Sequence, residues 1–328
     1  MEAKVPQDFC RGSFMSCAKT DKSTARSRII PSLVIREPAV AEEQTVYLNG
    51  EYLPLSEARI PVLDRGFIFG DGIYDVVPVY EGHPFRLAQH LTRLKRCLTQ
   101  IRIDPPMDQA GWSALVRELV ERHPQWPNQM VYLHVTRGVA KRDHGFPQGI
   151  TPTVFAMTNP FVPPTPENIG NGMSAISLPD ERWLHCDIKS ISLLGNILAR
   201  QSALDAHAKE AILFRDGYLT EGAASNIWVV RDGTLIAPPH DNLILEGVRY
   251  ALMEDLAARC GIPFDIRRIP ESEVRHADEL LLTAATKEVQ PITRLDGKPV
   301  GNGTPGPIFQ KLFAAYQQAK AESRQATA

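Results

Sequence analysis

The sequence of 328 residues contains few cysteines, and the five that are present form no C-x-x-C pair. An odd number of scattered thiols is typical of a reducing compartment, so we expect a cytoplasmic protein without disulfides. No apolar run approaches the roughly 20 residues that a membrane-spanning helix needs. The nine histidines are spread without the spacing of a metal site such as H-E-x-x-H. A disulfide scaffold, a membrane protein and a common metal centre are therefore not expected.

Positive charge is not in excess, because 36 Lys and Arg residues are set against 38 Asp and Glu residues. A nucleic-acid-binding protein normally shows a basic excess, so no such partner is expected. The glycine-rich segment GFIFGDG (66–72) matches neither G-x-G-x-x-G nor the phosphate loop that ends in G-K-[ST]. The serine hydrolase elbow G-x-S-x-G is also missing.

Proline is concentrated in the segment MTNPFVPPTPENIG, at Pro160, Pro163, Pro164 and Pro166. These prolines stiffen the chain and forbid a helix or a central strand there. We therefore predict a small N-terminal α/β domain at 45–159, a linker at 160–166 and a larger C-terminal domain at 167–324. The composition of residues 1–44 predicts a disordered tail.

Turn signals and apolar periodicity predict a mixture of strands and helices. Asn49-Gly50 lies between two β-rich runs, as in a hairpin with a tight primed turn. One helical face is predicted to carry Leu87, Leu91, Leu94, Leu98 and Ile101. Further helices are expected at about 192–207 and 246–259. Strands and helices do not alternate regularly, so the sequence predicts an α+β fold.

Lys189 lies at the end of an apolar run and before the helix expected near Ser192. At such a strand-to-helix junction a lysine amine is partly withdrawn from water and can form a Schiff base with a carbonyl compound. A lysine near the end of a strand is also commonly an exposed surface residue. The spacing leaves both interpretations open.

Two further sets of charged residues stand out. Glu221 follows an apolar strand and precedes small residues, which suits a partner for a buried cationic ring and equally an ordinary turn. A basic loop carries Arg137, Lys141, Arg142 and His144. Guanidinium groups bind carboxylates and phosphates bidentately, although basic surface loops are also common.

Six motifs, in this order along the chain, resemble those of the class IV (fold-type IV) pyridoxal-phosphate-dependent aminotransferases: DRGFIFGDGIYDVV, HLTRL, TRGVAKRDH, CDIKSISLLGN, LTEGAASN and LILEGVR. The resemblance extends from about Val46 to Lys320. Within the family, the segments at 142–144 and 186–195 are most similar to D-amino acid aminotransferases. The resemblance implies two α/β domains with the cofactor, pyridoxal 5'-phosphate (PLP), bound between them, and a cofactor-binding role for the larger domain.

The resemblance also implies roles for individual residues. It places cofactor contacts at Tyr74, Arg93, Lys189, Glu221, Leu245, Val248, Arg249 and Ala285. Lys189 is expected to form a Schiff base with the cofactor and to move the substrate proton. Glu221 is expected to face the pyridine nitrogen, and Arg93 to hold the phosphate. Backbone N–H groups near Val248, Arg249 and Ala285 are expected to complete the phosphate site.

Substrate binding is implied for Tyr74, Arg142 and His144. Tyr74 is expected to line the active site near the lysine. Arg142 and His144 are expected to hold the substrate α-carboxylate from the other subunit, which makes a homodimer with a shared active site part of the prediction. The position of this carboxylate clamp decides which face of the substrate Cα meets the lysine.

Two departures from the family pattern affect the phosphate site. Arg249 stands where threonine is usual, and Ala284 and Ala285 stand where hydroxyl residues are common. Each change removes a hydroxyl that contacts phosphate, whereas backbone donors survive.

The implied reaction is a ping-pong transamination in which a D-amino acid such as D-alanine gives its amino group to a 2-oxo acid such as 2-oxoglutarate. Two alternatives of the same fold remain open, a branched-chain L-amino acid aminotransferase and a lyase like aminodeoxychorismate lyase. The R-D-H loop favours the D-specific enzymes, and a lyase would need no amino acceptor.

Overall fold

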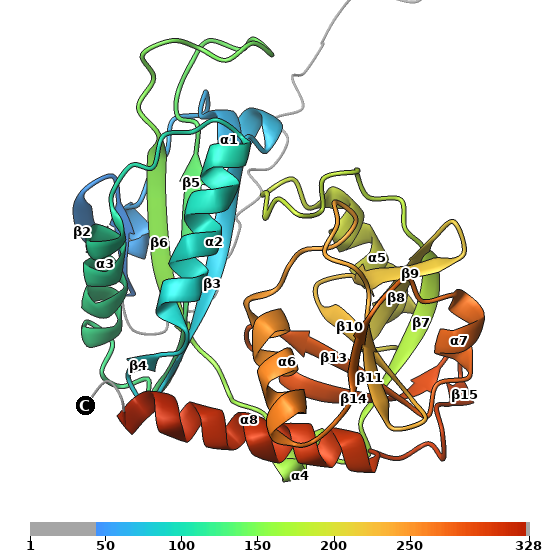
Figure 1. The fold of residues 1–328 in the computed structure, drawn as a ribbon. Helices are drawn as coiled ribbons and strands as arrows, with labels where there is room; N and C mark the ends of the chain where they lie inside the picture. The colour runs from blue at the N-terminus through green and yellow to red at the C-terminus, as the bar shows by residue number, and fades with distance from the viewer. Residues whose placement is uncertain (1–43, 326–328) are drawn as a thin grey trace, which may run out of the picture. The chain divides into compact units, whose positions relative to one another are not determined.

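The structure is a computed structural model that describes residues 44–325 (Figure 1). Residues 1–43 of the predicted disordered tail lie outside the described residues. Within residues 44–325, no helix combines the length and the apolar character that crossing a membrane requires.

Six strands in the order β2-β1-β6-β5-β3-β4 form the first sheet. Their bounds are β1 (Thr45–Leu48), β2 (Glu51–Pro54), β3 (Gly72–Tyr80), β4 (His83–Pro84), β5 (Asn128–Thr136) and β6 (Thr153–Pro160). Every pairing in this sheet is antiparallel. The predicted hairpin joins β1 to β2, with φ values of 50° at Asn49 and 106° at Gly50, as a primed turn requires.

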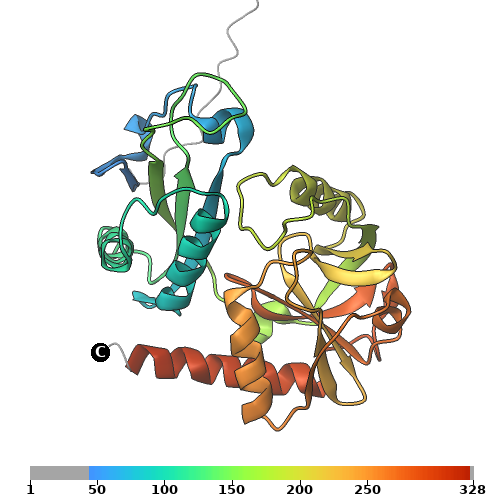
Figure 2. The same ribbon diagram turned by 45° about the horizontal axis from the view of Figure 1, so that its top comes forward.

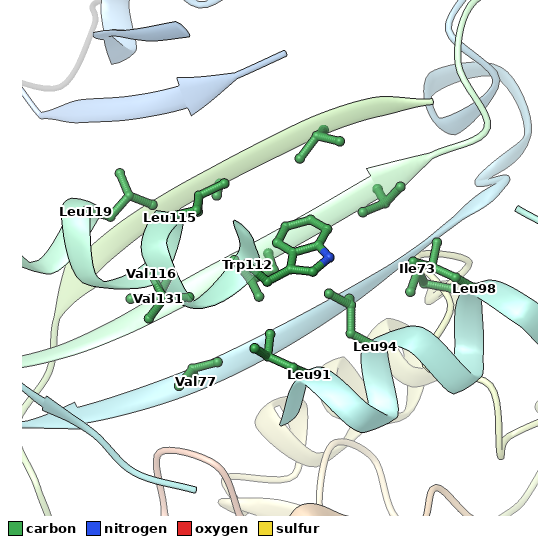
Figure 3. Packing of buried hydrophobic residues seen from close by; sticks show 14 of the residues in the cluster. Ile73, Val77, Leu91, Leu94, Leu98, Trp112, Leu115, Val116, Leu119 and Val131 are labelled. Carbon is green, nitrogen blue, oxygen red and sulfur yellow. The ribbon is translucent and has the colours of Figure 1, made fainter. Parts of the chain in front are cut away.

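Two helices, α2 (Leu87–Gln100) and α3 (Gln109–Glu121), pack against this sheet. Trp112 of α3 lies among Leu91 and Leu94 of α2 and the apolar side chains of the strands (Figure 3). The predicted apolar face of α2 is confirmed. Leu91, Leu94 and Leu98 are buried in one hydrophobic cluster, and Leu87 and Ile101 are partly buried against it. A neighbouring face of α2, also buried, carries His90 and Arg93, which matter for the site.

Nine strands form the second sheet, in the order β12-β11-β10-β13-β14-β7-β8-β9 with β15 added beside β14. Their bounds are β7 (Met173–Pro179), β8 (Glu210–Arg215), β9 (Tyr218–Gly222), β10 (Asn226–Arg231), β11 (Thr234–Ala237), β12 (Phe264–Ile266), β13 (Glu279–Ala284), β14 (Glu288–Leu295) and β15 (Lys298–Pro299). Parallel and antiparallel pairs are mixed, since β7 lies parallel to both β8 and β14.

The remaining helices are α1 (Arg65–Phe69), α4 (Pro166–Ile169), α5 (Leu194–Asp205), α6 (Val248–Arg259), α7 (Glu271–Arg275) and α8 (Pro307–Gln325), with a short 3-10 turn η1 (Leu55–Glu57). α5 and α6 confirm the helices expected near 192–207 and 246–259. α6 and α8 run close together beside the second sheet (Figures 1 and 2).

The fold is α+β, as predicted. Two details of the proline-rich segment were predicted wrongly, because β6, an inner strand of the first sheet, extends to Pro160, and α4 begins at Pro166. Proline is tolerated in the first turn of a helix, where its missing N–H has no intrahelical partner to lose. Tyr80 and Phe85 also belong to one buried cluster with Trp228 and Tyr316. Residues from before and after the predicted linker therefore share a hydrophobic core. The division into two domains at 160–166 stays a prediction.

Candidate active site

One pocket of about 520 Å³ is lined by residues that are far apart in the sequence. Strand β3 and helix α2 provide one part of the lining. Helix α5, the first turn of α6 and the loops after β7, β9, β11 and β13 provide most of the rest. All the residues with predicted cofactor contacts line this pocket: Tyr74, Arg93, Lys189, Glu221, Leu245, Val248, Arg249 and Ala285. Of the predicted substrate residues, Tyr74 lines it, whereas Arg142 and His144 do not.

Lys189 lies in an irregular segment between β7 and α5, and not at the end of a strand as its apolar flank predicted. Its backbone is held by the first sheet and by α2. The Tyr74 N–H donates to the Lys189 carbonyl (3.0 Å), and the Lys189 N–H donates to Cys97 Sγ (3.4 Å). Nζ of Lys189 lies 4.1 Å from the centre of the Tyr74 ring. The amine therefore faces the pocket because tertiary contacts place it there.

Glu221 is the second-last residue of β9, and only 5% of its surface is exposed. One carboxylate oxygen pairs with Arg182, and the other accepts hydrogen bonds from Asn226 Nδ2 (3.2 Å) and from the Leu245 N–H (3.1 Å). Burial raises the pKa of Glu221 to about 7, against the opposing effect of Arg182. A carboxyl group in this state gains from any cation that enters the pocket beside it.

Arg182 holds Glu221 in place and was not predicted. Its guanidinium binds both oxygens of Asp180, at 2.9 Å from Nε and 2.8 Å from NH2, and donates to the Leu243 carbonyl (3.2 Å). Asp180 in turn accepts from the Thr220 hydroxyl (2.8 Å). The sequence gives no signal for the contact with Glu221, because β9 and the loop after β11 reach Arg182 only in the folded chain.

A buried ionic cluster lies at the opposite end of the pocket lining, on α2 and β3. Arg93 donates to both oxygens of Asp75 at 2.8 Å, and His90 Nδ1 lies 2.7 Å from the same carboxylate. Burial opposes ionisation of Asp75, but Arg93 and His90 outweigh it and hold its pKa far below the usual range. Burial lowers the pKa of His90 to about 4, so this histidine is neutral near pH 7. A lone carboxylate within the apolar run IYDVVPVY was the overlooked signal for this cluster.

The variant Asp75→Asn is expected to destabilise the protein by about 3–5 kcal/mol, since it leaves the buried Arg93 without its carboxylate. Urea denaturation of the cofactor-loaded protein measures this change. Asp216→Asn is the matched control, because Asp216 is exposed in a turn and its φ of 51° suits asparagine. Equal midpoints for the Asp75→Asn variant and the parent would contradict the role given to Asp75.

The N-terminus of α6 points its first N–H groups at the pocket. Gly247 is the N-cap residue and no side chain caps the helix, so the first-turn donors remain available for a ligand. A Cβ atom at Gly247 would come within 2.2 Å of Asn226 Oδ1, so only glycine allows this approach. Val248, Arg249 and Ala285 line the pocket here, and Arg93 NH1 lies 3.5 Å from the Glu246 carbonyl. An uncapped helix N-terminus beside guanidinium groups is a site for an anion.

Arg142 and His144 lie on an exposed loop between β5 and β6. Helix α1 organises this loop, because the buried Arg65 donates to the backbone carbonyls of Asp143 (2.6 Å) and His144 (3.4 Å). The ring of Phe69 lies 5.4 Å from the His144 ring and 5.4 Å from the Arg142 guanidinium carbon. The loop is therefore held in a defined position while the side chains of Arg142 and His144 are exposed.

No group of three or more histidine, cysteine, aspartate or glutamate residues within 44–325 is arranged to hold a metal ion.

Comparison with known proteins gives a consistent result. The family model described as amino-transferase class IV matches residues 72–295. A D-alanine aminotransferase of Bacillus licheniformis is 39% identical over 272 residues, which cover 83% of this chain and 95% of the relative. A D-alanine aminotransferase of Staphylococcus aureus is 36% identical over 276 residues, with 84% and 97% covered.

Solved structures with the same fold include a branched-chain amino acid aminotransferase of Escherichia coli, with a TM-score of 0.79 and 22% identity. The branched-chain aminotransferase of Thermoproteus uzoniensis with norvaline gives a TM-score of 0.77 and 26% identity. In both cases 84% of this chain and 94% of the other chain are covered.

Proposed function

Because the chain belongs to the class IV aminotransferase family, whose members depend on PLP, we propose that it transfers the amino group of a D-amino acid to a 2-oxo acid. D-Alanine is the proposed donor and 2-oxoglutarate the proposed acceptor. The observation that carries this proposal is the extensive identity with enzymes named D-alanine aminotransferase, combined with a pocket that contains Lys189 and Glu221.

The donors and acceptors of the pocket fit PLP. A primary amine is available for the cofactor's aldehyde at Lys189, and a buried carboxylate at Glu221 suits the pyridine nitrogen. Arg93 and the uncapped N-terminus of α6 suit the phosphate. Leu245, whose N–H binds Glu221, also lines the pocket and offers an apolar side chain to the ring.

Individual residues of the pocket would have separate roles in the reaction. Bound PLP supplies the electron sink for cleavage of the substrate Cα–H bond. Lys189 is the proposed base that would take the substrate Cα proton and return it two atoms further along, in a 1,3-shift. Tyr74 lies directly beneath the amine and restricts where it can move. Glu221, held by Arg182 and Asn226, would place its carboxylate beside the pyridine nitrogen and favour its protonated form.

A homodimer is the second part of the proposal. The outward-facing position of Arg142 and His144 suits a carboxylate clamp for the pocket of a partner subunit. Helix α5 supports this interpretation, because Leu194, Ile197 and Leu198 are 69%, 59% and 60% exposed beside the pocket. Contiguous apolar surface of this kind marks protein–protein contacts. The free thiols of Cys97 and Cys186 support a reducing, cytoplasmic location.

The variant Arg142→Ala is expected to raise KM for D-alanine roughly 10- to 100-fold, the scale of one lost charge-assisted contact. Its affinity for PLP should remain that of the parent, because Arg142 does not line the pocket of its own chain. Steady-state kinetics and a cofactor titration measure the two effects. Lys141→Ala removes a neighbouring exposed charge and serves as the control. Unchanged kinetic constants in Arg142→Ala would remove this residue from the site.

The half-reaction without a 2-oxo acid tests the proposed activity directly. We expect D-alanine to bleach the visible band of the lysine-bound cofactor, and L-leucine to leave it unchanged. Bleaching by L-leucine alone would assign the protein to the branched-chain enzymes. A coloured protein that responds to neither amino acid would favour the lyase alternative, and both results would overturn the proposal.

A further inference from the structure

Arg249 is a buried cation that has no anionic partner among residues 44–325. Only 2% of its surface is exposed, and no carboxylate oxygen lies within 4.0 Å of its guanidinium. Its contacts are the Ala285 carbonyl (3.0 Å) and His90 Nε2 (3.4 Å), and its Nε has no hydrogen-bond partner. The guanidinium also lies 5.2 Å from the Phe85 ring. All these partners are neutral.

The contact with His90 shows how charge is distributed at this end of the pocket. A guanidinium can only donate hydrogen bonds, so His90 Nε2 accepts from Arg249 and Nδ1 carries the proton that is donated to Asp75. The histidine is therefore neutral, in agreement with a pKa lowered by burial to about 4. Asp75 already pairs with Arg93. Arg249 therefore reaches Asp75 only through the neutral His90, and no carboxylate pairs with it directly.

An unpaired buried charge is costly, by several kcal/mol, unless a ligand of opposite charge compensates it. The place where such a ligand can enter is defined, because Arg249 lines the pocket in the first turn of α6. That helix end also favours an anion through its free N–H groups and its dipole. Tyr316 of α8 and Phe85 lie beside the guanidinium and keep it in position.

We infer that the Arg249 side chain supplies the second positive charge for the cofactor phosphate, beside Arg93, and makes the pocket select the phosphorylated form of the cofactor. A phosphate monoester carries about −1.5 to −2 charges near neutral pH, so it balances the excess charge that the apoprotein holds. The same charge offsets the hydroxyl groups missing at Ala284 and Ala285. This inference rests on the proposed function and deepens it by assigning phosphate selectivity to one side chain of this chain.

Equilibrium binding to the apoenzyme tests the inference without any measurement of turnover. PLP and pyridoxal, which lacks the phosphate, are titrated separately into the parent, Arg249→Met and Arg249→Lys. We expect Arg249→Met to weaken PLP binding roughly 10- to 100-fold, the scale of one charge-assisted contact, and to leave pyridoxal binding unchanged. Arg249→Lys keeps the charge and should lose less. Arg259→Met is the matched control, because Arg259 ends the same helix and pairs with Glu322 at the surface.

A second measurement uses inorganic phosphate alone. It should raise the melting temperature of the parent apoenzyme more than that of Arg249→Met. If Arg249→Met does not fold, Arg249→Lys tests the inference instead. Its ratio of PLP affinity to pyridoxal affinity is expected to be lower than that of the parent. Equal weakening for both ligands, or no change for either, would overturn the inference and make Arg249 a packing residue. The proposed function would stand in that case, since D-alanine would still bleach the cofactor band.

Discussion

The variant Lys189→Ala is expected to have no measurable transamination activity and no visible band from lysine-bound cofactor. The structure gives two reasons. The amine of Lys189 faces the pocket from a backbone segment held by hydrogen bonds to Tyr74 and Cys97, and no other lysine of residues 44–325 lines this pocket. The same amine is the proposed base, so its removal eliminates both the covalent attachment and the proton transfer.

Three measurements check this expectation. Turnover is followed with D-alanine and 2-oxoglutarate, the visible spectrum reports attachment, and equilibrium dialysis reports PLP bound without a covalent bond. Dialysis should still detect PLP, because Arg93, Glu221 and the N-terminus of α6 remain. Lys209→Ala removes an exposed lysine and should behave as the parent. Retained steady-state turnover in Lys189→Ala would refute the role of Lys189.

The variant Glu221→Gln is expected to lower kcat roughly 100- to 1,000-fold, the scale of removing one preorganised electrostatic group from an active site. Glutamine keeps the size and the acceptor that faces Asn226 and Leu245, but it removes the negative charge. Burial already raises the pKa of Glu221 to about 7, so a cationic ring nitrogen beside it would favour the charged form of the carboxyl group. Without that charge the ring nitrogen loses its proton more readily and withdraws electrons less effectively.

The fold should survive this change. Arg182 keeps both oxygens of Asp180 as partners when Glu221 becomes neutral, so it is not left unpaired in the interior. KM and the thermal midpoint are therefore expected to change far less than kcat. Glu254→Gln, at an exposed position of α6, is the control. A kcat close to that of the parent would mean that Glu221 serves packing and not chemistry.

Some features of the site could be predicted from the sequence because they depend on local order. The spacing of apolar residues in α2 specified which face is buried, and it thereby placed His90 and Arg93 together on another face. The motif order identified Lys189, Glu221 and the segment around Arg249 as parts of one site. All of them line the pocket, although their assignment to particular atoms of the cofactor awaits the experiments above.

Other features could not be predicted, because they depend on partners from distant elements. The apolar run before Lys189 suggested a strand, yet hydrogen bonds from β3 and α2 hold that segment in an irregular conformation. Arg182 acquires its role only when β9 brings Glu221 to it. Asp75 compensates the charge of Arg93 only because α2 packs on β3 and brings Arg93 and His90 to its carboxylate.

The sequence by itself determined the α+β class, the turn at Asn49-Gly50 and the set of residues predicted to contact the cofactor, all of which line one pocket. Turn conformations and the period of a buried helical face depend on residues that are close together in the sequence, so the sequence alone predicts them. Only the tertiary structure decided which charges are compensated. It showed Asp75 shared by Arg93 and a neutral His90, Arg142 and His144 outside the pocket of their own chain, and Arg249 buried without an anion. The energy of a charge depends on every group around it, and those groups are brought together only by folding.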